Sequence, residues 1–208
     1  MTITKEQYNN ISAVILAGGA NKRFQGKTKA NIQISGVRII TRTIKVLHDI
    51  FDDIIIVTNT PEQFKGFSHY TMVPDEIKNV GPLGGIHAAM KAAKNDSVFV
   101  FASDMPCISS SLIKKHIEFY QKRRCDAAVP RIHNFKEPLH SIYNTKIFEK
   151  LDTYLKNEHD YSIDSFIKNL NIRYHNLEDT EENRKSFFNI NTPQDLSCIE
   201  LYAEAGYI

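Results

Sequence analysis

The chain has 208 residues, of which 42% are apolar and 24% are charged, and its formal net charge is +2. These values are ordinary for a globular domain with a substantial core, and a charge so near zero gives no argument for a nucleic-acid partner. The three cysteines are scattered and form no C-x-x-C pair, which argues against a zinc site or a disulfide framework.

Short apolar runs alternate with amphipathic patterns along the chain. The apolar runs predict strands over residues 13–17, 53–58, 70–73, 97–102 and 126–130. The helical periodicity predicts helices over residues 37–51, 86–94, 110–122, 145–156, 161–170 and 192–203. Shorter extended pieces are predicted at 30–34, 172–176 and 187–191, and a charged loop at 180–185. Residues 131–136 are predicted as a polar turn and residues 138–143 as a possible partner strand of 126–130, which makes 131–144 a hairpin or lid excursion. The alternation predicts one α/β domain over residues 1–208, a three-layer sandwich whose mostly parallel, Rossmann-like sheet carries helices on both faces.

The first apolar run ends at two glycines and leads into a cationic loop. Glycine lets a ligand approach the backbone closely, and successive N–H groups with nearby lysines suit phosphate. Gly26-Lys27-Thr28 looks like the end of a P-loop, but that pattern needs glycine at position 21, where the chain has Asn21. A nucleotidyltransferase loop, L-A-G-G-x-x-x-R-[MF]-x-G-x-x-K, is matched at Leu16, Ala17, Gly18, Gly19, Arg23, Phe24, Gly26 and Lys29. An ordinary turn with surface lysines is a third interpretation.

Two further segments indicate a ligand site at the same edge of the predicted sheet. Gly81-Pro-Leu-Gly-Gly85 precedes a predicted helix, whose N-terminus would favour an anionic or polar ligand; the alternative is a turn that only permits close helix–sheet packing. Asp104 follows the apolar run 97–102, and open α/β sheets bind ligands at the carboxyl ends of such strands. A carboxylate there suits Mg²⁺, whereas Ser109 and Ser110 are better placed to cap the next helix.

These three segments, with Asn189-Ile-Asn-Thr-Pro-Gln-Asp-Leu196, resemble the molybdenum cofactor guanylyltransferases of the nucleotide-diphospho-sugar-transferase-like superfamily. The resemblance covers almost the whole chain. It implies transfer of GMP from GTP to the phosphate of molybdopterin, release of pyrophosphate, and Mg²⁺ as the cofactor. It also implies transient contacts with other cofactor-biosynthesis proteins or molybdoenzymes. No signal peptide or membrane-spanning run is visible, so we expect a soluble, cytoplasmic protein without membrane contact.

The resemblance implies roles for individual residues. Arg23 and Lys29 would act on the phosphates and Asp104 on the metal, and these three would be the catalytic residues. Nucleotide contacts are implied at Leu16, Ala17, Gly18, Gly19, Lys29, Asn59, Asp75, Gly81, Pro82, Leu83 and Gly84. Asn189 and Asn191 match paired asparagines on the pterin side. The chain departs from the family at Thr28, where aspartate is usual, and at Phe24-Gln25, where Met-Gly is usual.

The chemistry itself calls for few side-chain roles. Attack of one phosphate on the α-phosphate of a nucleotide brings two anions together, so catalysis depends mostly on positioning and charge neutralisation. Leu-Ala-Gly-Gly favours guanine, because cytidylyl relatives more often carry Leu-Ala-Ala-Gly. The alternatives are a related nucleotidyltransferase that uses CTP or a sugar-phosphate acceptor, and a nucleotide-binding module without turnover.

Overall fold

The computed structural model describes residues 10–18 and 28–204. The strands of the main sheet are β1 (Ile11–Leu16), β4 (Ile54–Val57), β5 (Thr71–Val73), β6 (Ser97–Ala102), β7 (Ala127–Ile132), β8 (Phe135–Lys136), β9 (His140–Asn144) and β10 (Ile172–Asn176), while β2 (Gln33–Ile34) and β3 (Val37–Arg38) form a separate hairpin. The α-helices are α1 (Ile39–His48), α2 (Pro82–Ala92), α3 (Ser110–Gln121), α4 (Phe148–Asn157), α5 (Ile163–Ile167), α6 (Glu181–Ser186) and α7 (Pro193–Glu204). The 3₁₀ helices are η3 (Lys29–Asn31), η4 (Pro61–Phe67) and η5 (Thr145–Ile147).

The main sheet is mostly parallel, in the order β10-β7-β9-β6-β1-β4-β5, with β8 paired to β7. Strand β1 is parallel to both β4 and β6, β4 is parallel to β5, and β7 is parallel to β10. Strand β9 is antiparallel to both of its neighbours, β6 and β7. The carboxyl ends of β6, β1, β4 and β5 therefore meet at one edge.

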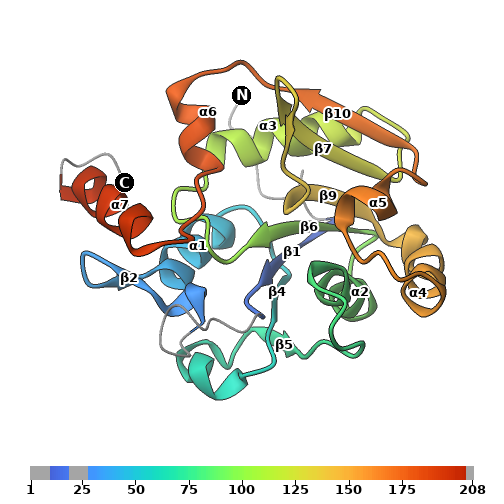
Figure 1. Ribbon diagram of the computed structural model, residues 1–208, viewed down its shortest axis with the longest axis horizontal. Coiled ribbons are helices and arrows are strands. Elements are labelled where there is room, and N and C mark those ends of the chain that lie inside the picture. Colours follow the sequence, from blue (N-terminus) through green and yellow to red (C-terminus); the bar gives the residue numbers. More distant parts are fainter. Residues whose placement is uncertain (1–9, 19–27, 205–208) are drawn as a thin grey trace.

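Helices cover both faces of the sheet and make the fold a three-layer sandwich (Figure 1). In β6, Phe99 and Phe101 pack on one face with α1, α3 and η4, whereas Val98 and Val100 pack on the other with α2, α4 and α5. Because both faces are covered, the central strands are continuous apolar runs rather than alternating ones. The predicted fold class is confirmed.

The segment 131–144 contains the predicted partner strand, because β9 is antiparallel to β7, but it is not an excursion from the sheet. Strand β8 does turn back along the end of β7, and its Phe135 is 62% exposed. Strand β9, in contrast, lies inside the sheet between β6 and β7. Its residues 140–143 are all buried, with Ile142 in the core of one face and Tyr143 in that of the other. The lid prediction is therefore corrected, since a strand with two buried faces cannot move as a lid.

Two predictions near the C-terminus are wrong, and one is confirmed. Residues 181–186 form α6 rather than a charged loop, because the Thr180 hydroxyl accepts the N–H of Asn183 as an N-cap. Residues 187–191 form no strand, and the N–H of Ile190 donates instead to the carbonyl of Asp104 at 2.9 Å. Helix α7 begins with the predicted capping box between Thr192 and Asp195, at 2.8 and 3.2 Å.

Helix α7 lies beside the β2–β3 hairpin at one end of the molecule (Figure 1). A small apolar cluster joins them, formed by Ile32, Ile34, Ile39, Ile190 and Ile199. Among the described helices, none has the length and apolarity that crossing a bilayer requires.

Candidate functional site

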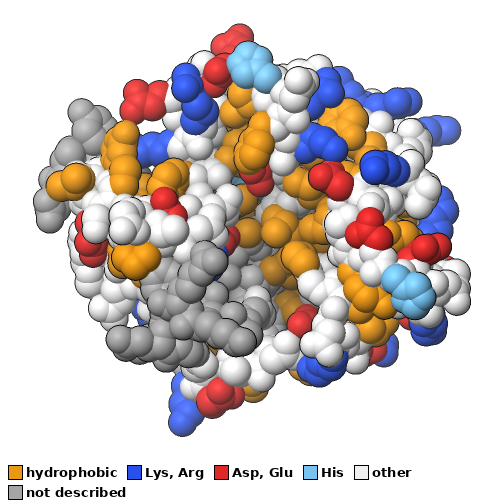
Figure 2. Space-filling view, in the orientation of Figure 1, with side chains coloured by type: hydrophobic (Ala, Val, Ile, Leu, Met, Phe, Trp, Pro, Cys, Tyr) orange, Lys and Arg blue, Asp and Glu red, His pale blue; other side chains and the backbone are white. Residues whose placement is uncertain are grey.

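A cavity of about 850 Å³ opens at the edge where β6, β1, β4 and β5 end. The space-filling view shows this face hollowed near its centre, with hydrophobic side chains on the floor of the hollow (Figure 2). Its lining includes the predicted site residues Leu16, Ala17, Gly18, Lys29, Asn59, Asp75, Gly81, Pro82 and Asp104. Parallel strands thus bring together residues that are distant in the sequence.

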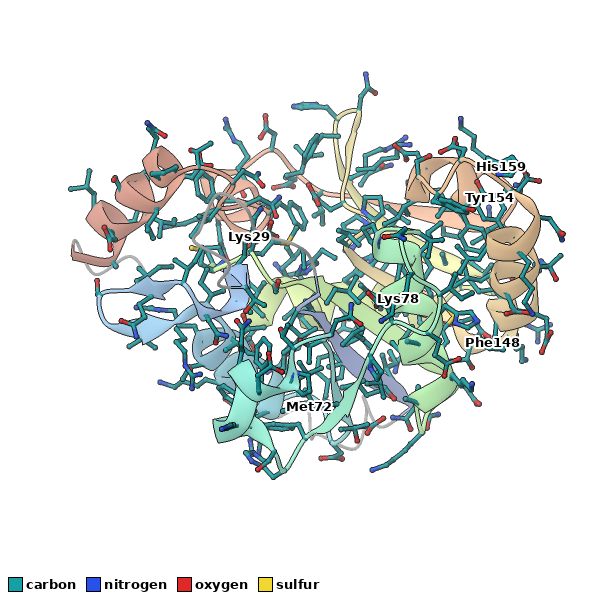
Figure 3. The ribbon with its side chains drawn as sticks, turned by 60° about the horizontal axis from the view of Figure 1, so that its bottom comes forward. Lys29, Met72, Lys78, Phe148, Tyr154 and His159 are labelled. Carbon is teal, nitrogen blue, oxygen red and sulfur yellow. The ribbon has the colours of Figure 1, made fainter. Side chains whose placement is uncertain are left out.

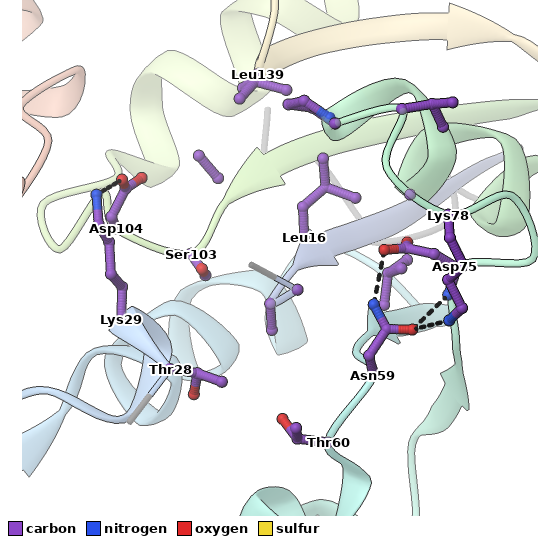
Figure 4. Close-up of a pocket in the computed structure, with 18 of the residues that line it drawn as sticks. Leu16, Thr28, Lys29, Asn59, Thr60, Asp75, Lys78, Ser103, Asp104 and Leu139 are labelled. Atoms are coloured by element: carbon purple, nitrogen blue, oxygen red, sulfur yellow. Dashed lines mark hydrogen bonds and ion pairs between the residues drawn. The ribbon is translucent and has the colours of Figure 1, made fainter. Parts of the chain in front are cut away.

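At one end of the cavity, Lys29 pairs with Asp104. The Lys29 ammonium lies 2.8 Å from Asp104 Oδ2 (Figure 4). It also donates to Asn191 Oδ1 at 2.6 Å. The two charged side chains are 20% and 19% exposed, so the pair is only partly shielded from solvent. The bond between Ile190 N–H and the Asp104 carbonyl holds the Asn191 segment against the end of β6. The arrangement offers an ammonium and a carboxylate to an anionic ligand and its metal.

At the other end of the cavity, Asn59 and Asp75 form a reciprocal pair. Asn59 Nδ2 donates to Asp75 Oδ2 at 2.8 Å, and the N–H of Asp75 donates back to Asn59 Oδ1 at 3.2 Å (Figure 4). Lys78 donates to the same Asn59 oxygen at 2.7 Å. Lys29 and Lys78 reach the cavity from different segments, one before β2 and the other before α2 (Figure 3). Charged and amide groups therefore lie at both ends of the cavity.

The end of β1 forms the wall between these two groups. Leu16 is half-buried in the lining, and the N–H of Ala17 donates to the Val57 carbonyl at 2.8 Å. That N–H is consequently not available to a base. A side chain at Gly18 would stand 3.5 Å from Asp75 Oδ2. Glycine there leaves the Asn59–Asp75 pair open to the cavity.

Helix α2 begins four residues earlier than predicted, at Pro82, so the Gly-Pro-rich segment is largely its first turn. Gly81, the N-cap, has φ +60° and ψ −149°, a conformation that glycine adopts at little cost. Leu83 and Gly84 are buried and lie outside the cavity lining. Leu83 packs in the core beneath α2, and the nucleotide contacts expected of Leu83 and Gly84 stay predictions, while Gly81 and Pro82 line the cavity.

We expect Gly84→Ala to destabilise the protein by about 1–3 kcal/mol through overpacking. A Cβ at Gly84 would lie 2.9 Å from both the Ile77 carbonyl oxygen and Val80 Cγ2, so the backbone would have to shift. Gly66→Ala is the matched control, since its Cβ would approach only Arg38 Nη2, at 3.6 Å. Urea unfolding of both variants measures the effect, and equal stabilities would contradict the packing role of Gly84.

Thr28, which stands where the family usually has aspartate, anchors the start of η3. Its N–H donates to Gln63 Oε1 at 3.2 Å, and its hydroxyl accepts Asn31 Nδ2 at 3.1 Å. Its side chain is buried. The backbone N–H of Thr28 thus ties the segment of Lys29 to η4, and its hydroxyl bonds Asn31 within η3.

Some predicted residues are not brought to these two groups. Asn189 Nδ2 donates to the carbonyl of Phe187 at 3.2 Å, and only Asn191 of the asparagine pair reaches Lys29. Gly19 and Arg23 lie outside the described residues. Their roles stay predictions.

Glu137, which is only 6% exposed, was not predicted as a site residue from the sequence. Burial, and then the charge of Asp104, raise the pKa of Glu137 to about 7. Lys78 and Leu139, which line the cavity, were also missed. A glutamate directly before a proline in a polar turn is typical of surface loops, so the available signal was weak.

The chain is similar to known proteins over most of its length. The model of the MobA-like NTP transferase domain matches residues 13–175. A "Probable molybdenum cofactor guanylyltransferase" of Natranaerobius thermophilus is 35% identical over 93% of this chain and 97% of that protein. A "Molybdenum cofactor guanylyltransferase" of Syntrophotalea carbinolica is 33% identical over 88% of each. The structure of molybdopterin-guanine dinucleotide biosynthesis protein A from Archaeoglobus fulgidus matches with a TM-score of 0.78 at 26% identity, covering 93% of this chain and 99% of that one.

Proposed function

The chain belongs to the MobA-like NTP transferase family, and from this premise we propose that it transfers GMP from GTP to the phosphate of molybdopterin. One observation carries the proposal. The Lys29–Asp104 pair and the Asn59–Asp75 pair lie at opposite ends of one cavity, at the ends of adjacent parallel strands. Such a site can hold the phosphates at one end and the nucleoside at the other.

The transfer requires positioned charges rather than a nucleophilic side chain. A phosphate oxygen of molybdopterin attacks the α-phosphorus of GTP, the bond to the β-phosphate breaks, and pyrophosphate leaves with the bonding electrons. Lys29 offsets negative charge on the phosphates while Asp104 and Asn191 hold its ammonium in place. We propose that Arg23 stabilises the negative charge of the departing pyrophosphate, a role that rests on the loop motif alone.

The residues at the end of β6 fit a Mg²⁺ ion. Asp104 Oδ2 is bonded to Lys29, whereas no described residue hydrogen-bonds to Asp104 Oδ1. Mg²⁺ usually takes one or two carboxylate ligands together with water and phosphate oxygens. Within residues 10–18 and 28–204 no group of three or more acidic, histidine or cysteine side chains could hold a metal. When bound, the ion supplies positive charge to the reacting phosphates.

We expect GTP to be preferred over ATP by about two orders of magnitude. Guanine presents an O6 acceptor and an N2 donor, and each buried group left without a partner by the wrong base costs about 1–3 kcal/mol. Asn59, Asp75 and Lys78 supply both acceptors and donors at the nucleoside end. The measurement is pyrophosphate release with Mg²⁺, molybdopterin and GTP, CTP or ATP side by side.

The same assay separates the alternatives. A clear CTP preference would place the protein in the cytidylyl branch, and transfer only to a sugar phosphate would sink the pterin assignment. Nucleotide binding without any pyrophosphate release would favour the binding module. None of these alternatives is favoured by the named relatives.

Two further expectations belong to this proposal. We propose that the molybdopterin phosphate binds near Asn191. This residue contacts Lys29 but lies outside the cavity lining. We also propose a cytoplasmic location and transient contacts with other cofactor-biosynthesis proteins or molybdoenzymes, to which the product would be passed. Cell fractionation and cross-linking would check both.

A further inference from the structure

Lys78 brings an ammonium group to the nucleoside end of the cavity. The residue stands between β5 and α2, and its side chain lines the cavity together with those of Asn59 and Asp75 (Figure 4). Its Nζ donates to Asn59 Oδ1 at 2.7 Å, and it forms no ion pair with any residue in the described part of the chain. Lys29, at the other end, is in contrast paired with Asp104 at 2.8 Å. Since an ammonium has three N–H groups, two of those on Lys78 have no partner among the described residues.

Asn59 determines which groups beside Lys78 can meet a ligand. Its Oδ1 accepts two hydrogen bonds, from Lys78 and from the N–H of Asp75 at 3.2 Å, so both of its acceptor positions are occupied. Its Nδ2 donates to Asp75 Oδ2 at 2.8 Å, whereas no described residue hydrogen-bonds to Asp75 Oδ1. The ammonium of Lys78 and the second carboxylate oxygen of Asp75 are therefore a donor and an acceptor held by one fixed amide.

This donor and this acceptor discriminate among the groups of a nucleotide. A phosphate offers only acceptors, and the carboxylate of Asp75 repels its negative charge. Guanine presents its O6 acceptor next to the N1–H and N2–H donors, so one edge of the base can meet both the ammonium and the carboxylate. Adenine presents an amino group in place of O6, and an ammonium has no acceptor to receive that N–H. The pair is therefore complementary to guanine.

We propose that Lys78 selects guanine by donating a hydrogen bond to its O6. The inference rests on the proposed function, in which GTP is the nucleotide, and it identifies the side chain that distinguishes guanine from adenine. Lysine donating to O6 is also a common specific contact between proteins and guanine in nucleic acids. Lys78 is exposed, so its charge carries little desolvation cost until the base covers it.

The test is calorimetric titration of the full chain with Mg²⁺-bound nucleotides in the absence of an acceptor substrate. GTP and ITP carry the 6-oxygen, whereas ATP and 2-aminopurine riboside triphosphate lack it. We expect Lys78→Met to raise the Kd for GTP and for ITP by about tenfold to a hundredfold, because each loses a hydrogen bond from a charged donor. The Kd values for the other two nucleotides should stay close to those of the wild type, since neither base offers O6.

Two further variants accompany this titration. Lys91→Met is the matched control, because Lys91 is a lysine of α2 that bonds Glu76 at 2.8 Å and lies outside the cavity lining. It should bind all of the nucleotides as the wild type does. Lys78→Arg keeps the charge and the donors, so it should retain part of the preference for nucleotides that carry the 6-oxygen. Thermal melting checks that each variant is folded.

An equal rise in the Kd of every nucleotide would overturn the proposal, because it would place the ammonium at the ribose or the phosphates, which the nucleotides share. Unchanged Kd values in Lys78→Met would overturn it as well, even if the enzyme transferred GMP normally. A wild-type chain whose preference for the 6-oxygen depended on Lys78, but which transferred no nucleotide, would contradict the proposed function and leave the role of Lys78 standing.

Discussion

Replacing Asp104 with asparagine is expected to lower kcat by about three orders of magnitude. The carboxamide keeps the shape of the side chain but loses the charge that would hold Mg²⁺ at the reacting phosphates. Charge stabilisation of this kind contributes several kcal/mol to the transition state, and about 4 kcal/mol corresponds to a thousandfold change in rate. Initial rates of pyrophosphate release with GTP, Mg²⁺ and molybdopterin measure the effect.

The fold should tolerate this change. Asp104 is a partly exposed residue at a strand end, so we expect its replacement to alter the free energy of unfolding by at most about 1 kcal/mol. Glu76→Gln is a suitable control, because Glu76 also bonds a lysine at 2.8 Å, that of Lys91, and lies outside the cavity lining. Near-normal kcat in Asp104→Asn would remove this carboxylate from the mechanism, and an equal loss in Glu76→Gln would point to a general effect of charge.

His140→Leu is expected to make the protein less sensitive to acid. Burial lowers the pKa of His140 to about 3, from about 6.5 in the unfolded chain. Below pH 6.5 the imidazole is therefore protonated in the unfolded state and neutral in the folded state. The free energy of unfolding then falls by about 1.4 kcal/mol for each pH unit until the pH reaches the folded-state pKa. Leucine cannot bind that proton. The stability difference between variant and wild type should grow by about 2 kcal/mol from pH 7 to pH 5.

The surroundings of His140 explain why this substitution should be tolerated. The edges of Phe99, Phe101 and Phe187 lie around the imidazole, with ring centroids 5.1–5.3 Å away. Neither ring nitrogen has a hydrogen-bond partner in the described structure. Replacing such a group by an apolar one of similar size is close to neutral or stabilising at neutral pH. Urea unfolding at several pH values measures the effect, with His159→Leu at an exposed position as control; a pH-independent difference for His140→Leu would contradict the prediction.

The strands and the position of Asp104 after β6 could be predicted because their signals are local. Residues 97–102 form one apolar run and one strand, and Asp104 follows it in both the prediction and the structure. Helix α6 was missed because its sequence shows no apolar face, since only one of its six residues has a buried side chain. The N-cap Thr180 was the one local sign of this helix.

The place of β9 in the sheet and the burial of Glu137 could not be predicted, because they depend on contacts between segments that are distant in the sequence. No periodicity places β9 between β6 and β7, and without that placement Glu137 looks like a residue of a surface turn. Leu83 and Gly84 looked like part of a ligand loop because glycines serve both close packing and close approach of a ligand. At Gly84 the structure shows close packing, because an added Cβ would lie 2.9 Å from Ile77 and Val80.

The contact between Lys29 and Asn191 also sets the order in which the site can form during synthesis. The two residues are 162 positions apart. At about 5–20 residues per second, a ribosome needs roughly 8–30 s to travel from one to the other. The growing chain can pair Lys29 with Asp104 well before Asn191 exists. Until the segment of Asn191 is made, Asp104 is the only one of these two partners that the Lys29 ammonium can bond.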